Sequence, residues 1–157
     1  MRRVLYLLLF VFACGLTATA QKVKPVEYGG SVNLIREIDQ NTIVLRTLGY
    51  GKKEANARED AEVRVIRAVL YVGFQGHSKL INESEAAFEQ KHPDFITSFW
   101  DTKIYKDFIT GIISVGSLSK VKGQKVKSMP FDVTVNVKAL RQYLQQNNYG
   151  GRLGFGF

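Results

Sequence analysis

The sequence predicts an α+β domain: a two-layer sandwich in which a mostly antiparallel sheet of about four strands packs against one long helix and one or more short helices. Three observations lead to this prediction. Residues 53–72 carry alanine and valine at helical spacing, and residues 131–137 alternate apolar and polar side chains. The expected elements follow the order strand, strand, helix, short helices, strand, strand, helix. A single domain over residues 31–147 accommodates them all.

The N-terminus has the layout of a secretory signal peptide. Two arginines precede an apolar run over residues 4–13, and the small residues Ala18-Thr19-Ala20 stand before Gln21. Residues 1–20 are therefore expected to be removed by cleavage between Ala20 and Gln21, which lowers the formal net charge of +8 by two. Residues 21–30 contain lysine, proline and glycine without apolar periodicity, so they are expected to form a linker.

Cys14 is the only cysteine of the chain, and it lies inside the expected signal. Its removal leaves no thiol, which excludes disulfides, cysteine nucleophiles and cysteine metal ligands. The alternative is a bacterial lipoprotein signal, in which Cys14 is acylated and becomes the first residue. The stretch Val11-Phe12-Ala13-Cys14-Gly15 matches that signal loosely, with a bulky residue at Phe12. We therefore expect a periplasmic or extracellular protein, with lipid anchoring through Cys14 as the alternative.

The first two strands are expected at the start of the domain. Val32 and Leu34 alternate with polar neighbours, and the turn-like Asp39-Gln40-Asn41 separates them from Ile43-Val44-Leu45. The second strand is expected to end at Gly49.

The long helix is expected over residues 53–72, with Gly73 as its stop. Its charged residues are expected to form a solvated face. Its packing face is defined by five small or β-branched residues: Ala57, Ala61, Val65, Ala68 and Val72.

Gly49-Tyr50-Gly51 precedes this helix and raises the question of a phosphate site. A dinucleotide fingerprint needs a third glycine where Glu54 stands, and a P-loop needs a different spacing and a hydroxyl after its lysine. Glu54 also places negative charge at the helix start, which repels phosphate. Lys52 and Lys53 still attract anions, but a plain strand-to-helix turn is the expected structure.

The middle of the chain is rich in aromatic residues. Asn82 is followed by Glu85 three positions later, which predicts the start of a short helix, and Pro93 predicts the start of another. The aromatic segment 88–108 is expected to supply core, or core plus interface. Its candidate apolar contact residues are Phe95, Phe99 and Trp100.

The last third is expected to be β structure followed by a helix. One strand is expected over residues 111–121, with Ile113 and Val115 inside, and a turn around Gly123 leads to the alternating valines of the next strand. A helix is expected over residues 138–147.

A glycine-rich and aromatic tail over residues 148–157 ends the chain. Phe155 and Phe157 are candidate apolar contacts there, either with a partner or with the protein's own domain.

The glycine-helix unit carries a family resemblance. Gly49-Tyr50-Gly51, followed by Glu54-Ala55, Ala57, Asp60-Ala61 and Ala68, resembles the small bacterial envelope domains grouped with the twenty-kilodalton surface lipoproteins and the amino-terminal domain of flagellar assembly protein T. The similarity covers residues 45–73 well and residues 111–138 loosely. The chain departs from the group by its aromatic insert between helix and strands. The resemblance implies an envelope-facing, non-catalytic module.

A search for reactive groups predicts no catalytic, metal or cofactor site. His77 and His92 lack the spacing of a metal-binding helix, and Ser78 beside His77 is not a triad. The carboxylates between Glu83 and Asp94 are explained by capping and solvation.

Four lysines form the one concentrated basic patch: Lys120, Lys122, Lys125 and Lys127. On a hairpin they would form a ridge for an anionic partner such as lipid headgroups or acidic glycans, or they would protect a sheet edge from aggregation. Nucleic acid is not expected as a partner, because the signal pattern predicts export and the ridge lacks interleaved aromatics.

The sequence therefore predicts an exported, non-catalytic binding or structural module of a bacterial cell envelope, with a protein or an envelope component as its partner. The alternative is a small-ligand-binding or hydrolytic periplasmic domain that uses the aromatic segment 88–108.

Overall fold

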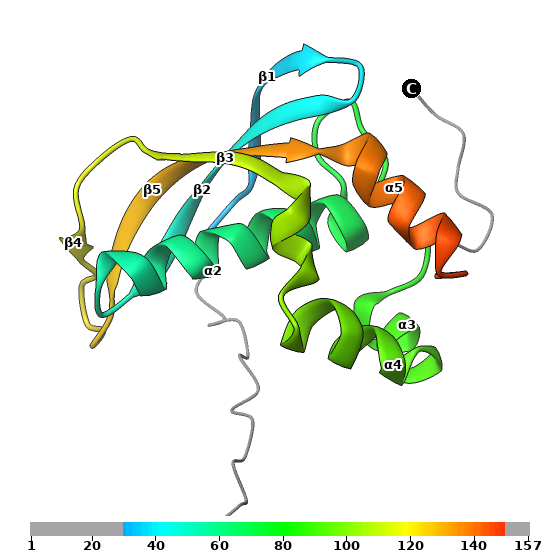
Figure 1. The fold of residues 1–157 in the computed structure, drawn as a ribbon. Helices are drawn as coiled ribbons and strands as arrows, with labels where there is room; N and C mark the ends of the chain where they lie inside the picture. The colour runs from blue at the N-terminus through cyan, green and yellow to red at the C-terminus, as the bar shows by residue number, and fades with distance from the viewer. Residues whose placement is uncertain (1–29, 150–157) are drawn as a thin grey trace, which may run out of the picture.

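A computed structural model describes residues 30–149 and confirms the α+β class (Figure 1). The expected signal and its cleavage site, Cys14 and the tail residues Phe155 and Phe157 lie outside the described residues. The strands are β1 (Asn33–Asp39), β2 (Thr42–Gly51), β3 (Ile109–Ser114), β4 (Ser119–Lys120) and β5 (Lys127–Asn136). The helices are α2 (Glu54–Arg67), η1 (Ala68–Val72), α3 (Glu85–Lys91), α4 (Pro93–Phe95), η2 (Ile96–Asp101), η3 (Ile104–Phe108) and α5 (Val137–Gln146).

The sheet has five antiparallel strands in the order β1-β2-β5-β3, and β4 pairs with β5 beyond the end of β3. Helix α2 runs across one face of it, which is consistent with the predicted two layers (Figure 1). The alternation predicted for the last strand is confirmed, because Phe131, Val133 and Val135 are buried while their neighbours are not.

The opposite face of the sheet is largely open to solvent. The strand predicted over residues 111–121 is two strands in the structure, β3 ending at Ser114 and the short β4. Ile113 and Val115, predicted to lie inside, are 67% and 41% exposed. Ile113 pairs with Asp132 on the open face, whereas its neighbour Ile112 packs against the core. An apolar residue on the uncovered face of a sheet stays exposed unless other side chains cover it; Val44, on the same face, is 5% exposed.

Helix α2 approaches β2 closely. Ala57 and Ala61 are fully buried, and a side chain at Gly49 would collide with the backbone carbonyl of Ala57. Asp60 accepts a hydrogen bond from the Tyr50 backbone N–H at 2.9 Å, which joins the helix to the end of the strand. The second strand thus continues to Gly51, two residues beyond the expected end.

The last turn of the long helix is a π-helix, which changes which residues face the core. The Gly73 backbone N–H donates to the carbonyl of Ala68, an i to i+5 bond of 2.8 Å. Val72, predicted to lie on the packing face, is therefore 75% exposed, and Tyr71 is buried instead. The other four residues of the predicted packing face are buried.

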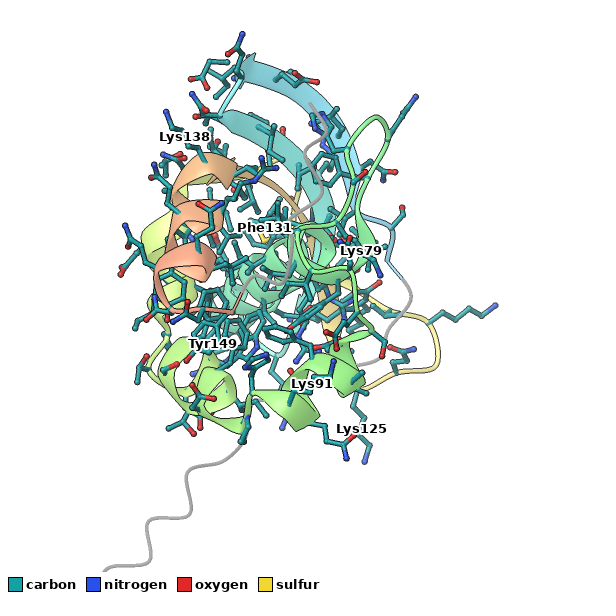
Figure 2. All side chains as sticks on the ribbon, turned by 90° about the vertical axis from the view of Figure 1, so that its right-hand side faces the viewer. Lys79, Lys91, Lys125, Phe131, Lys138 and Tyr149 are labelled. Atoms are coloured by element: carbon teal, nitrogen blue, oxygen red, sulfur yellow. The ribbon has the colours of Figure 1, made fainter. Side chains whose placement is uncertain are left out.

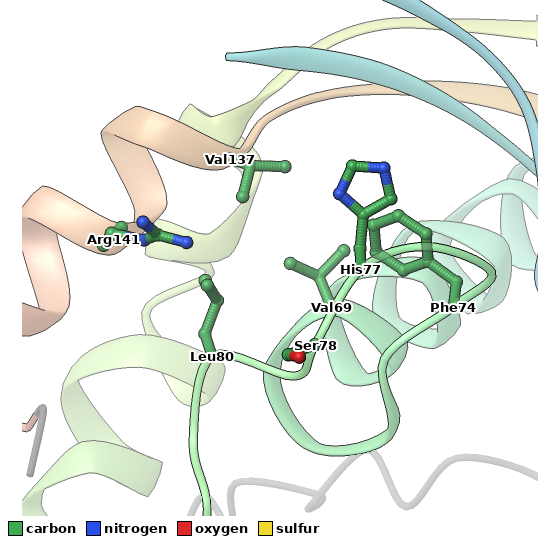
Figure 3. A pocket seen from close by; sticks show the side chains of 7 residues that line it. All are labelled: Val69, Phe74, His77, Ser78, Leu80, Val137 and Arg141. Carbon is green, nitrogen blue, oxygen red and sulfur yellow. The ribbon is translucent and has the colours of Figure 1, made fainter. Parts of the chain in front are cut away.

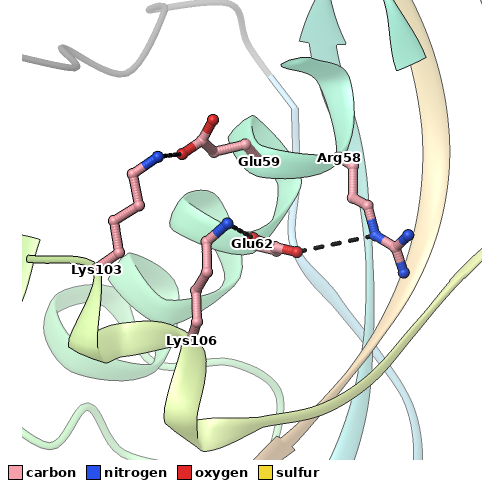
Figure 4. A network of polar contacts seen from close by, with 5 residues as sticks. All are labelled: Arg58, Glu59, Glu62, Lys103 and Lys106. Carbon is pink, nitrogen blue, oxygen red and sulfur yellow. Dashed lines mark hydrogen bonds and ion pairs between the residues drawn. The ribbon is translucent and has the colours of Figure 1, made fainter. Parts of the chain in front are cut away.

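The charged side of α2 is partly covered: Glu62 is buried and Glu59 is half-buried, whereas Arg58 stays exposed as expected for a solvated face. The segment around η3 lies beside it and contributes two lysines (Figure 4). Lys103 pairs with Glu59, and Lys106 Nζ lies 3.2 Å from Glu62 Oε2. Arg58 Nε lies 3.9 Å from the other carboxylate oxygen of Glu62, so this buried residue sits between two cations.

The segments from α3 to η3 form the aromatic part of the core. Phe95 and Phe99 are fully buried and their rings stack at 4.6 Å. Tyr149 completes the cluster from the C-terminal side, 5.0 Å from the Phe95 ring (Figure 2). The start of α3 differs from the prediction: Ser84, not Asn82, is the cap, and its hydroxyl accepts from the Ala87 backbone N–H at 3.3 Å.

Helix α5 begins at Val137, one residue earlier than expected and directly after β5. Asn136 caps it, because its side-chain oxygen accepts from the Ala139 backbone N–H at 2.9 Å. Val137 and Lys138 also donate backbone hydrogen bonds to the carbonyl of Asn41 in the β1–β2 turn. Within residues 30–149 no helix is long and apolar enough to cross a membrane.

Candidate functional site

The strand register gathers lysines from two distant parts of the sequence at one end of the sheet. Lys127 pairs with Gly51 on one side and with Lys120 on the other. The turn that follows Gly51 contains Lys52 and Lys53, so these two residues join the predicted ridge. We call this group the lysine end: Lys52, Lys53, Lys120, Lys122, Lys125 and Lys127.

The lysine end carries an excess of positive charge, and Glu54, directly after Lys53, is the adjacent carboxylate in the sequence. Residues 51–53 and 119–128 contain no carboxylate, and none of the six side chains makes an ion pair within the part of the chain that the structure describes. Five are exposed and Lys127 is half-buried. Like charges directly across two strands, such as Lys120 and Lys127, weaken the pairing of the strands. The lysine end is therefore a candidate site for an anionic partner.

Sequence reasoning found the four hairpin lysines but did not join Lys52 and Lys53 to them. The missing information was strand pairing: only the antiparallel register of β2 with β5 places residue 51 beside residue 127. The glycines of the same turn need no phosphate to explain them. A Cβ at Gly51 would lie 2.5 Å from the Ala57 backbone nitrogen, so both glycines permit close contact with α2.

The aromatic candidates belong to the interior. Phe95 and Phe99 have no exposed surface, so neither is available for an apolar contact in this conformation. Trp100 is half-buried and packs edge-on against both rings. The aromatic segment thus supplies core, one of the two roles expected for it.

A polar cluster that the sequence did not reveal lies where α2 meets α3. Arg67 Nη1 lies 2.7 Å from Glu85 Oε1, and the guanidinium stands over the Trp100 ring at 5.2 Å. Burial, followed by the charges of Glu89 and Glu85, raises the pKa of Tyr71, which keeps its hydroxyl protonated. Burial also raises the pKa of Glu85, while Arg67 opposes the rise. The Tyr71 hydroxyl and the Trp100 indole nitrogen are buried, so this cluster forms part of the packing between the helices.

The two histidines are half-buried and contact neighbouring side chains. His77 Nε2 lies 3.0 Å from Glu37 Oε1, and His92 packs against the rings of Phe88 and Tyr149. Within residues 30–149 no three histidine, cysteine, aspartate or glutamate side chains come together as a metal site.

The first residues of the predicted tail fold back on the domain. Tyr149 is buried, and its hydroxyl donates to Asp94 Oδ2 at 2.6 Å. This hydrogen bond lowers the pKa of Asp94 and raises that of Tyr149. Tyr149, two residues beyond the expected domain boundary, therefore belongs to the core.

No protein-family model matches the chain, and neither the curated proteins nor the solved structures gave a match. The resemblance to small bacterial envelope domains stays a prediction.

Proposed function

We propose that this protein is an exported, non-catalytic binding module of a bacterial cell envelope that attaches to anionic membrane lipids through its lysine end. The observation that carries the proposal is the convergence of six unpaired lysines at one end of the sheet. The N-terminal signal pattern supports an envelope location.

The chemistry of the lysine end favours a lipid surface over a small anion. Lysine is a flexible point charge, whereas arginine forms the planar fork that recognises a single phosphate or carboxylate by two bonds. The lysine end contains no arginine. A set of separate point charges suits a layer of headgroups, where each lysine near the surface contributes about 1 kcal/mol.

Sedimentation with lipid vesicles tests the proposal. The purified protein is expected to bind vesicles that contain phosphatidylglycerol and not vesicles of phosphatidylcholine alone. Binding is expected to weaken strongly as salt is raised, because mobile ions screen exposed charges.

A pair of charge-matched variants locates the contact. Lys122→Gln with Lys125→Gln removes two charges from the lysine end, and Lys91→Gln with Lys103→Gln removes two charges elsewhere. The first double variant is expected to weaken binding at least about tenfold, and the second much less. Equal weakening would mean that net charge alone attracts the protein. Binding that ignores salt and both double variants would refute the proposal.

A further inference from the structure

A surface hollow lies near Lys138, at the opposite end of the molecule from Lys125 of the lysine end (Figure 2). Its volume is about 570 Å³, within the range of sites that hold small ligands. We call it the hairpin cleft; it is lined by Glu37, Gln40, Asn41, Lys138 and Arg141. These residues come from the β1–β2 hairpin and the first turns of α5.

A smaller recess adjoins the hairpin cleft and shares Arg141 with it (Figure 3). Its volume of about 10 Å³ is at the lower limit for holding a single water molecule. His77 and Arg141 approach it from opposite sides, and Val69, Leu80 and Val137 supply apolar walls (Figure 3).

The lining of the hairpin cleft is held in place by contacts of its own. The Asn41 carbonyl accepts from the Val137 backbone N–H at 2.8 Å, which ties the hairpin turn to α5. The loop that carries His77 is closed by reciprocal backbone hydrogen bonds between Phe74 and His77, at 3.1 and 2.8 Å. His77 in turn holds Glu37. A site whose walls are fixed before binding loses less entropy when a ligand enters.

The charges of the hairpin cleft are separated. Lys138 and Arg141 lie three positions apart on α5, so they share a face of the helix. Glu37 stands on the hairpin, where its side chain is 53% exposed and engages His77 through one of its two oxygens. The amides of Gln40 and Asn41, which both donate and accept hydrogen bonds, complete the lining.

From this polarity we infer that the hairpin cleft binds a small zwitterion, an amino acid or a short peptide. Its carboxylate lies toward Lys138 and Arg141, and its ammonium group lies toward Glu37. A peptide bond between the two charged ends is matched by the side-chain amides. This site is separate from the lysine end, so it stands whether or not the protein binds membranes.

Nuclear magnetic resonance titration with alanyl-alanine tests the inference against two derivatives. The N-acetyl derivative lacks the ammonium group, and the C-terminal amide lacks the carboxylate. Alanyl-alanine is expected to cause saturable shifts of the backbone amides of Asn41, His77 and Lys138. Each derivative is expected to bind at least about tenfold more weakly, because a charge-assisted contact is lost.

Two variants assign the ends of the ligand. Lys138→Gln is expected to weaken the binding of alanyl-alanine at least about tenfold and to leave the weak binding of its C-terminal amide unchanged. Glu37→Gln is expected to remove the preference for the free amine over the acetylated peptide. Lys91→Gln, an exposed lysine distant from the cleft, serves as the control and should leave binding unchanged. The inference is overturned by an absence of saturable shifts, by shifts centred elsewhere, or by equal affinity for all three peptides.

Discussion

Position 49 requires a glycine because helix α2 lies directly against it. A Cβ built there would lie 2.9 Å from the Ala61 Cβ and would overlap the carbonyl oxygen of Ala57. Neither Gly49 nor Gly51 has a positive φ, so steric room and not backbone freedom explains both residues. The two glycines resemble part of a phosphate-binding loop, but here they allow the strand to lie close to the helix.

Replacing Gly49 by alanine is expected to destabilise the protein by at least about 3 kcal/mol, because neither the helix backbone nor Ala61 can yield without moving α2. Chemical denaturation measures the loss. Gly111→Ala is the matched control in the same sheet, since its nearest neighbour would be Thr134 Oγ1 at an ordinary 3.5 Å. A Gly49→Ala protein as stable as the control would show that the close approach carries no energetic weight.

At the scale of elements, hydrophobic periodicity correctly predicted the buried face of an element where that face packs against one neighbouring layer. The alanines of α2 and the valines of β5 each face one neighbour, and their positions were correct. Val72 was misplaced because a π-helical turn rotates it away, and no local pattern signalled that turn. Ile113 was misplaced because burial depends on a covering layer that sequence alternation cannot reveal.

Two ion pairs join α2 to the segment around η3, and the pair of Lys106 with Glu62 is expected to contribute more than that of Lys103 with Glu59. The Glu62 side chain is 10% exposed and that of Glu59 27% exposed, so Glu62 has less access to water when its lysine is removed (Figure 4). Lys106→Gln is therefore expected to cost about 1–2 kcal/mol more than Lys103→Gln. The free energies of unfolding of the two single variants test this directly. Equal losses would indicate that Arg58 alone satisfies Glu62.

At the scale of the whole molecule, long-range pairing creates both candidate surfaces. The lysine end requires that β2 and β5 pair, and the hairpin cleft requires that the start of α5 return to the β1–β2 turn. The sequence shows the charged residues of both, but not their proximity. Hydrophobic patterning fixes which face of each element is buried, whereas these surfaces depend on which elements become neighbours.

The stability of the protein at acid pH depends on one carboxylate in the sheet and one in the helical insert. Arg46 donates to both oxygens of Asp132 on the open face of the sheet, at 2.6 and 2.8 Å, and this contact lowers the pKa of Asp132. The hydroxyl of Tyr149 lowers the pKa of Asp94 in the helical insert. Each carboxylate thus titrates, in the folded state, below its ordinary pKa of about 3.9. The stability that each contributes is fully present above that pKa and is lost as the pH falls through the lower, folded value.

A double variant with Asp94→Asn and Asp132→Asn is therefore expected to melt below the wild-type protein at neutral pH, and the gap is expected to narrow as the pH falls below about 3.9 and through the lowered folded-state pKa values. As the carboxylates of the wild type become protonated, the two proteins come to carry the same charge at these positions. Thermal melting across a pH series measures the gap. Asp107→Asn removes an exposed carboxylate that makes no side-chain hydrogen bond or ion pair in the described part of the chain, and it should not produce this pH-dependent gap. A gap that stays constant down to acid pH would mean that these hydrogen bonds act through shape and not through charge.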